Sequence, residues 1–364
     1  MKCKIDVSVI IPVYNSEKYI ADILDDLIKQ TYENFEVIVI NDGSQDGSQK
    51  ILEEYEKKDD RIRVLEVMNA GVSKARNLGI SIAKGEYIRF IDADDRINED
   101  SLKYMMDIVK DNPTIDIVIG TFRSIPEMNY YYGEYLKPGK HTLEEISVDF
   151  LHNVKSFYYG VVWNKLYKRS FISKHNLLFD ENLIWCEDFI FNLQYFNCCE
   201  CFYTLPLDKI VYDYIQHEGS ATKSIQSMPD EKSHVIEKIN LYREKEAKKF
   251  FDRAGLSDVF EIEWKYSFLF LELMAIAKNQ KINFKGKKDK TKELLTKAGM
   301  HEYIKLKKNY LKKEPFYHFT YQVIEKERYT LMTLYLCIYA WMSKNTNVLK
   351  WVWKKLGGRR PKVL

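Results

Sequence analysis

Apolar runs and amphipathic segments alternate along the first third of the chain. The amphipathic segments carry apolar residues at helical spacing, as at Ile20, Ile23 and Leu27. Strands that are apolar along their length are buried on both faces, and strands that alternate with helices form parallel sheets. The chain is therefore predicted to be an α/β protein with a mostly parallel central sheet, flanked by helices. The expected strands are Val7–Ile11, Phe35–Ile40, Ile62–Val67, Tyr87–Ile91 and Ile115–Ile119.

The alternation stops after Gly219, and long charged segments with helical spacing follow, such as Glu231–Phe251 and Glu261–Ala277. A chain of 364 residues is long enough for one large domain or two of ordinary size. We therefore expect an α/β domain over residues 1–220 and a helical C-terminal region over residues 221–364.

Polar side chains follow three of the predicted strands: Asn15, Asn41–Asp42 and the acidic run Asp92–Asp95. Parallel sheets bind ligands outside the carboxyl ends of their strands, so these side chains are expected to converge on one cleft. The three carboxylates of the acidic run repel each other unless a cation or donor groups compensate. Mg²⁺ or Mn²⁺ would suit them, because both prefer oxygen ligands and often bridge to phosphates. The alternative is a solvated loop that caps the helix predicted near Glu99–Val109.

Two further segments carry charged side chains beside predicted helices. In Asn69–Asn77, the helix N-terminus favours an anion and Arg76 suits a phosphate or carboxylate, unless it is a surface arginine on an amphipathic helix. Glu187 and Asp188 precede the apolar helix Phe189–Phe196. They are either first-turn acids favoured by the helix dipole, or one of them deprotonates an attacking hydroxyl.

The sequence argues against several common classes of protein. The first strand is followed neither by G-x-G-x-x-G nor by a Walker A motif, which weakens dehydrogenase and phosphotransfer interpretations. The cysteines at positions 198, 199 and 201 match no standard zinc spacing and are expected to be ordinary buried thiols. The N-terminus has no signal-peptide pattern, so we expect a cytosolic, reduced compartment without disulfides.

Six motifs occur in the order seen in family 2 glycosyltransferases, which are inverting enzymes with the Rossmann-like GT-A fold. The resemblance covers roughly residues 5–220. The motifs are Ile10–Asn15 (IIPVYN), Asn41–Asp46 (NDGSQD), Gly71–Asn77 (GVSKARN), Phe90–Asp95 (FIDADD), Val162–Tyr167 (VWNKLY) and Glu187–Asp188 (ED).

The resemblance implies a nucleotide-sugar donor, usually one that carries uridine diphosphate (UDP). Pro12, Tyr14 and Asn15 would line the nucleotide pocket, partly through their backbone. Asp42 would accept a hydrogen bond from the base, usually uracil, and Arg76 would face the nucleotide and the diphosphate.

The resemblance also implies a metal ion, Mn²⁺ or Mg²⁺, bound between the protein and the diphosphate. Asp94 would hold the metal, and Asp92 would touch the ribose or the sugar. Many relatives have an arginine near the position of His217. His217 therefore either contacts phosphate or metal, or faces solvent.

The implied reaction is a direct displacement, in which Asp188 takes the proton of an acceptor hydroxyl as that hydroxyl attacks the anomeric carbon. Trp163, Lys165 and Glu187 would lie near the donor sugar or the acceptor. We expect the acceptor to be a glycan or a lipid-linked saccharide in bacterial capsule or exopolysaccharide synthesis. The alternatives are a catalytically silent nucleotide-sugar-binding scaffold and a sugar-nucleotide pyrophosphorylase, although the glycine-rich nucleotidyl loop of the latter is absent.

The C-terminal segments predict a contact with membrane. Tyr329–Met342 is apolar on all sides but shorter than the about 20 residues that span a bilayer. Ser343–Leu364 has seven Lys and Arg and no acid, and its apolar residues share one helix face. This pattern is typical of a peripheral anchor on the anionic inner face of a bacterial membrane; the alternative is a core helix with a solvated basic tail. Nucleic acid is not an expected partner, because the basic cluster is short and terminal. The oligomeric state stays open.

Overall fold

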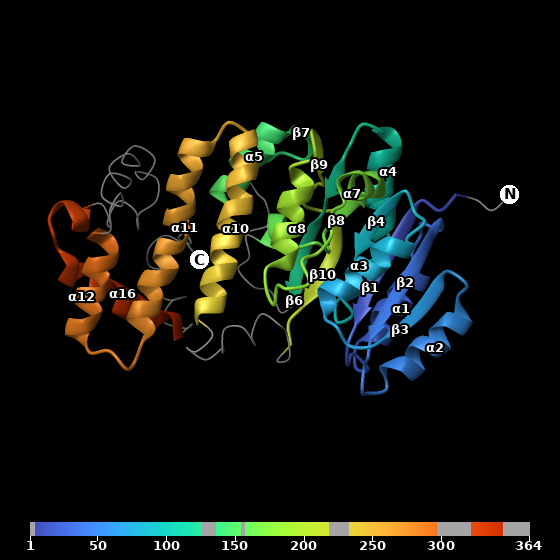
Figure 1. Ribbon diagram of the computed structural model, residues 1–364, viewed down its shortest axis with the longest axis horizontal. Coiled ribbons are helices and arrows are strands. Elements are labelled where there is room, and N and C mark those ends of the chain that lie inside the picture. Colours follow the sequence, from blue (N-terminus) through green and yellow to red (C-terminus); the bar gives the residue numbers. More distant parts are fainter. Residues whose placement is uncertain (1–3, 126–135, 154–156, 218–232, 297–321, 345–364) are drawn as a thin grey trace. The chain divides into compact units, whose positions relative to one another are not determined.

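The structure is a computed structural model that describes residues 4–125, 136–153, 157–217, 233–296 and 322–344 (Figure 1). The chain divides into two compact units, Met1–Phe260 and Glu261–Leu364. The first unit therefore extends past the boundary predicted near residue 220. The reason is that α10 (Ser233–Arg253) packs against α8 (Glu187–Phe196) of the same unit.

The centre of the first unit is a mostly parallel sheet, as predicted. The described residues form eight strands in the order β3-β2-β1-β4-β8-β5-β9-β7. Four of the seven pairings are parallel, namely those of β1 with β2 and β4, of β2 with β3, and of β5 with β9. The strands are β1 (Val7–Val13), β2 (Phe35–Asp42), β3 (Ile62–Val67), β4 (Tyr87–Phe90), β5 (Ile117–Ile119), β7 (Gly139–Thr142), β8 (Lys165–Lys168) and β9 (Cys201–Thr204).

Strand β8 lies antiparallel between β4 and β5 and was not predicted. Its register pairs Tyr167 with Ile88 on one side and Lys165 with Ile119 on the other. The segment predicted to contact the donor sugar or the acceptor thus becomes an interior strand of the sheet.

A second sheet branches off where β5 ends. Gly120 separates β5 from β6 (Thr121–Ile125), which pairs with β10 (Ile210–Ile215). A Cβ atom at Gly120 would lie 2.3 Å from Val211 of β10, so only glycine permits this close turn. The small sheet brings Tyr212 towards the end of β4, where the acidic run begins.

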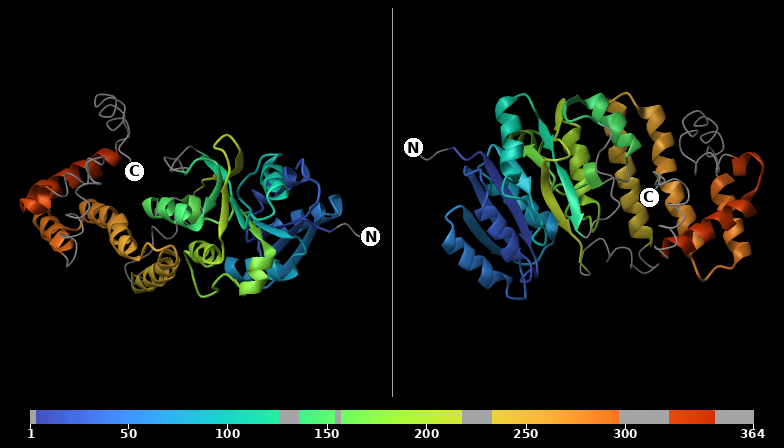
Figure 2. Two further views of the ribbon diagram at one scale, coloured as in Figure 1. Left: turned by 90° about the horizontal axis from the view of Figure 1, so that it is seen from above. Right: turned by 180° about the vertical axis from the view of Figure 1, so that it is seen from behind.

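Helices flank the sheet, and Figure 2 shows them from two further sides. Helix α3 packs on β1 and β2, and its approach is close because a Cβ atom at Gly79 would lie 2.4 Å from Ile10. The helices of this unit not yet given are α1 (Ile20–Ile28), α2 (Ser48–Lys58), α3 (Val72–Ile82), α4 (Ser101–Asp111), α5 (Leu143–His152), α6 (Phe157–Gly160) and α7 (Arg169–His175).

The second unit has an apolar core of its own. It is formed by α11 (Ser257–Lys278), α12 (Phe284–Thr296) and α16 (Tyr329–Lys344), and α12 packs against α16. Met332 and Leu336 of α16 are buried in this core, whereas Leu334 and Ile338 are about half exposed. None of the described helices is both long enough and apolar enough to cross a membrane. The basic tail lies outside the described residues from position 345 onward.

Candidate active site

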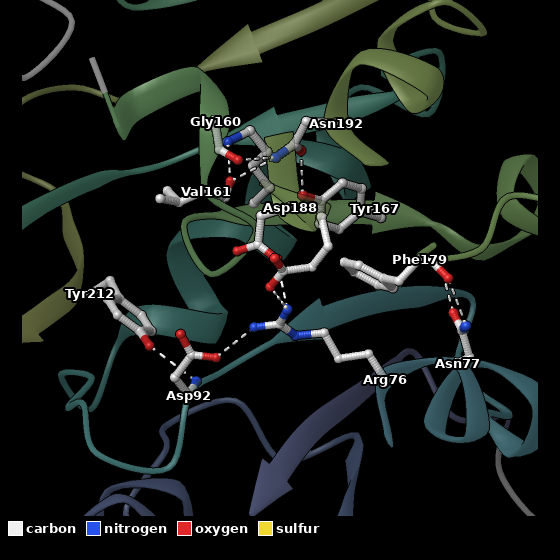
Figure 3. A network of polar contacts seen from close by, with 12 residues as sticks. Arg76, Asn77, Asp92, Gly160, Val161, Tyr167, Phe179, Asp188, Asn192 and Tyr212 are labelled. Carbon is white, nitrogen blue, oxygen red and sulfur yellow. Dashed lines mark hydrogen bonds and ion pairs between the residues drawn. The ribbon is translucent and has the colours of Figure 1, made fainter. Parts of the chain in front are cut away.

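Arg76 of α3 joins the end of β4 to the first turn of α8 (Figure 3). Its Nη2 donates to Asp92 Oδ1 at 2.9 Å, and its Nη1 donates to Asp188 Oδ1 at 2.6 Å and to Glu187 Oε1 at 3.1 Å. The Arg76 side chain is only 4% exposed, while the three carboxylates are partly exposed. One buried guanidinium therefore gathers three of the residues that the sequence predicted as site residues.

The charges around Arg76 do not balance, because three carboxylates share one cation. Desolvation raises the pKa of Asp188 to about 8; Arg76 opposes this rise, and Glu187 and Asp92 add to it. Desolvation likewise raises the pKa of Asp92, again against the opposing effect of Arg76. An aspartate whose pKa lies near the working pH can both accept and release a proton, as a general base must.

The acidic run divides its carboxylates among three environments. Asp92 faces Arg76, as described. Asp95 is buried and accepts hydrogen bonds from the Tyr212 hydroxyl at 2.7 Å and from the Ile215 backbone N–H at 2.7 Å. Asp94 is one-third exposed and lies 2.5 Å from His217 Nε2. Asp94 and His217 are thus brought together, and a contact of His217 with metal or phosphate stays a prediction.

The loops after β1, β2 and β3 are tied to one another. The Asn15 side chain accepts from the Gln45 backbone N–H at 2.7 Å, and the Asn15 N–H donates to Ser44 Oγ at 3.0 Å. Both oxygens of Asp42 accept backbone N–H groups, from Ala70 and from Gly71, at 2.8 Å each. The loops after β1, β2 and β3 are therefore joined by hydrogen bonds, whereas the convergence of Asn15 and Asn41–Asp42 with the acidic run on one cleft stays a prediction.

The remaining residues predicted for the nucleotide pocket differ in exposure. Tyr14 is 52% exposed, and Pro12 is partly exposed near the end of β1. Proline has no backbone N–H, and β1 tolerates it because the pairing of β1 with β4 has already ended at Ile10.

The side chains of Trp163 and Lys165 are buried in the protein and contact other residues of the chain. Trp163 stacks on Tyr212, with ring centroids 4.3 Å apart and an angle of 10° between the ring planes. The Lys165 ammonium donates to the carbonyls of Tyr158 and Val161 and to the Asn164 side chain, and burial lowers its pKa well below the usual value. Among the described residues, neither side chain makes a hydrogen bond or ion pair with Asp92 or Asp94, and their predicted contact with sugar or acceptor stays a prediction.

Comparison with known sequences bears on this geometry. Residues 8–184 match the sequence model of Glycosyl transferase family 2. The putative glycosyltransferase EpsH of Bacillus subtilis (strain 168) is 33% identical over 283 residues, which cover 72% of this chain and 78% of EpsH. The chain belongs to glycosyltransferase family 2.

Two further proteins are similar to this chain. The uncharacterized glycosyltransferase EpsJ of the same Bacillus strain is 34% identical over 60% of this chain, and the match spans 63% of EpsJ, less than two thirds of its length. The crystal structure of Staphylococcus aureus TarS residues 1–349 in complex with UDP-GlcNAc has a TM-score of 0.59 at 21% identity and covers 90% of both chains. At this identity the likeness concerns the fold alone, and it confirms the GT-A fold.

Sequence reasoning missed three residues that build the site of this family 2 chain. The Arg76 guanidinium lies over the Phe179 ring, 5.2 Å from its centroid. The Asn77 side chain holds the Phe179 backbone, because it donates to the Phe179 carbonyl at 2.9 Å and accepts the Phe179 N–H at 2.8 Å. The Tyr212 hydroxyl accepts the Asp92 backbone N–H at 3.1 Å. Asn77 stands inside a recognised motif and was within reach of prediction; Phe179 and Tyr212 are ordinary aromatic residues whose partners are distant in sequence.

Proposed function

We propose that the protein is an inverting glycosyltransferase that moves a sugar from a UDP-sugar to a hydroxyl of a glycan or lipid-linked saccharide. The observation that supports this most is the joint attachment of Asp92 and Asp188 to Arg76. It sets the proposed general base beside the strand end at which the donor is proposed to bind.

Asp188 is the proposed base that takes the proton of the attacking hydroxyl. Arg76 occupies its Oδ1, and its Oδ2 has no hydrogen-bond partner among the residues described by the structure. The side chain is 21% exposed, so an acceptor hydroxyl can reach this free oxygen. A base must lie within hydrogen-bond distance of the proton that it removes, and Oδ2 meets that condition for an acceptor docked at the start of α8.

Asp94 and His217 are the proposed protein ligands of a divalent ion, Mn²⁺ or Mg²⁺. In the described part of the chain, no group of three or more His, Cys, Asp or Glu is arranged to hold a metal. A pair of side chains fits an ion that takes its other ligands from the diphosphate and water, as Mg²⁺ commonly does. When bound, the ion would supply positive charge to the departing diphosphate.

The nucleotide is proposed to lie over the loops after β1 and β2. Exposed Tyr14 offers an aromatic surface, and Asn15 and Asp42 hold the loop backbones that would line the pocket. Because both Asp42 oxygens already accept backbone N–H groups, the base would share a lone pair of Asp42 with them.

The acceptor proposal draws on the relatives. Staphylococcus aureus TarS is named a poly(ribitol-phosphate) β-N-acetylglucosaminyltransferase and is 30% identical over 64% of this chain. We infer a hydroxyl-rich surface polymer or its lipid-linked precursor as acceptor, and a site on the inner face of the bacterial membrane. The half-exposed apolar residues of α16, followed by the basic tail, are suited to a peripheral contact with anionic lipid.

The function is tested by screening UDP-sugars with Mn²⁺ for a thermal shift and for released UDP. A ligand that binds the native state alone raises its stability, so a donor raises the melting temperature. UDP release that needs an added glycan acceptor supports the transferase. Donor binding without UDP release under any acceptor condition supports the silent scaffold instead.

The membrane contact has a separate test. Deletion of residues 343–364 should release the protein from vesicles that contain phosphatidylserine at physiological salt, because about 1 kcal/mol is lost for each basic residue near an anionic surface. Equal binding of the full and shortened chains would contradict the contact.

A further inference from the structure

Arg76 has little freedom to reach a bound nucleotide. Both of its terminal nitrogens are engaged, and its Nε is buried without a hydrogen-bond partner in the described residues. The Arg76 guanidinium packs against the ring of Phe179. Phe179 in turn stacks on Phe191 of α8, with ring centroids 4.1 Å apart and an angle of 3° between the planes. Because Arg76 is held in one position, it fixes the orientation of the carboxylates that it contacts.

The contacts of Arg76 determine which oxygen of Asp188 faces an acceptor. Nη1 holds Oδ1 at 2.6 Å and leaves Oδ2 unoccupied. The same nitrogen holds Glu187, and Nη2 points the other way to Asp92. The planar fork of arginine holds its donors in a fixed geometry that points both ways, whereas a lysine ammonium is a compact charge on a flexible stem.

We propose that Arg76 is a positioning residue for the transfer step, which orients Asp188 and ties it to the donor end of β4. This proposal rests on the proposed function, because it requires Asp188 to be the base. It differs from the assignment of Arg76 to the diphosphate, since it places the effect of Arg76 on turnover and not on nucleotide affinity.

The charges that face Asp188 support an additional effect on its protonation. They come from several elements. Arg76 lowers the pKa of Asp188 more than Lys165 on β8 does, and burial lowers the pKa of Lys165 itself, so removal of Arg76 takes away the main opposing charge. The titratable and charged groups around Asp188 are Cys186 and Glu187 at the start of α8, Arg76 on α3, Asp92 after β4, and Lys165 and Tyr167 on β8. Without Arg76, Asp188 should hold its proton to higher pH.

The test compares Arg76→Gln and Arg76→Lys with Lys74→Gln, an exposed cation two residues earlier on α3. We expect Arg76→Gln to lower kcat by about 100-fold or more, which is within the range for loss of general-base catalysis. The acidic limb of its pH profile should move to higher pH. Arg76→Lys, which keeps the charge but not the fork, should lie between Arg76→Gln and the unchanged protein. Lys74→Gln should stay within about twofold, as surface substitutions usually do.

UDP alone, titrated by calorimetry, separates the two roles of Arg76. Affinity for UDP within about threefold of the unchanged protein supports positioning, because about tenfold corresponds to a lost interaction of 1.4 kcal/mol. A tenfold or larger loss of UDP affinity with kcat retained would assign Arg76 to the diphosphate and overturn the proposal. Circular dichroism confirms that each variant is folded, and Arg76→Lys carries the test if Arg76→Gln does not fold.

Failure of the proposed function can be distinguished from failure of the proposal for Arg76. If Asp188→Asn keeps full turnover, Asp188 is not the base and the proposed function fails at that point. If Asp188→Asn is inactive while Arg76→Gln keeps both kcat and pH profile, the proposal for Arg76 fails alone.

Discussion

The two ends of the acidic run differ in what surrounds them. At Asp92, a buried guanidinium holds the carboxylate together with two acids from another helix. At Asp94, one histidine is the partner, and the carboxylate is one-third exposed. Asp92 thus lies in a closed, protein-bound arrangement and Asp94 in a more open one. The chain turns between them, and the Asp95 backbone N–H donates to the Asp92 carbonyl at 3.4 Å.

The largest loss of turnover is expected at the closed end, when Asp188 is substituted. We expect Asp188→Asn to lower kcat by about 10³-fold, because a positioned base contributes about 10²–10⁴-fold. UDP affinity should stay the same, since the amide keeps the shape of the side chain. Turnover and UDP calorimetry measure the two quantities, and normal turnover would show that the proton leaves by another route.

At the open end, we expect substitution of Asp94 to abolish the effect of the metal on UDP affinity. UDP affinity of the unchanged protein should fall when EDTA replaces Mn²⁺, whereas Asp94→Asn should bind UDP weakly and equally under both conditions. We expect a loss of about tenfold or more, comparable with the 10–100-fold effects seen around metal ligands. Glu99→Gln, an exposed acid on the same segment, is the matched control. Retention of metal-dependent binding in Asp94→Asn would remove the distinction between the two ends.

The pH dependence sharpens the same comparison. Desolvation raises the pKa of Asp188 to about 8, so the base form is scarce at lower pH and kcat/KM should rise about tenfold per pH unit up to that value. The free energy of unfolding should change with pH in the opposite direction to kcat/KM. The folded chain keeps a proton that the unfolded chain releases near pH 4, so stability from this group is present at low pH and is lost as pH rises through about 8. Asp188→Asn should flatten that decline in thermal melts.

The smallest effect is expected at Tyr212, which hydrogen-bonds Asp92 and Asp95 of the acidic run. Tyr212→Phe removes the acceptor for the Asp92 N–H and a donor to buried Asp95, which costs about 1–3 kcal/mol of stability. Activity should fall several-fold through displacement of the run. Tyr203→Phe on β9 is the control, because the Tyr203 hydroxyl makes no hydrogen bond with the described residues. An equal change in melting temperature for both variants would contradict the supporting role.

Local sequence was enough to predict the strands of the parallel half of the sheet and the first turn of α8. Strands β1 to β5 lie within two residues of the predicted runs. For β1, β2, β4 and β5 the reason is that a strand buried on both faces shows its burial in composition alone. The helix that begins at Glu187 was indicated by its acids and apolar residues.

The antiparallel strand β8 and the small β6–β10 sheet could not be foreseen in this way. Lys165–Lys168 has charged residues at both ends and only four residues, and its pairing depends on β4 and β5. The motif that contains Trp163 and Lys165 was therefore recognised, but not its burial. Tyr212 was missed for the same reason, since its partners precede it by more than 110 residues.

The Arg76 contacts also set an order of events during synthesis. Asp92 follows Arg76 by 16 residues, but Glu187 and Asp188 follow by 111 and 112. At roughly 5–20 residues per second, the ribosome needs about 6–22 s to add that stretch. During this interval the guanidinium has one of its three carboxylates, and a buried cation with too few partners is costly. We therefore expect this end of the sheet to stay open to water until α8 has been added to the chain.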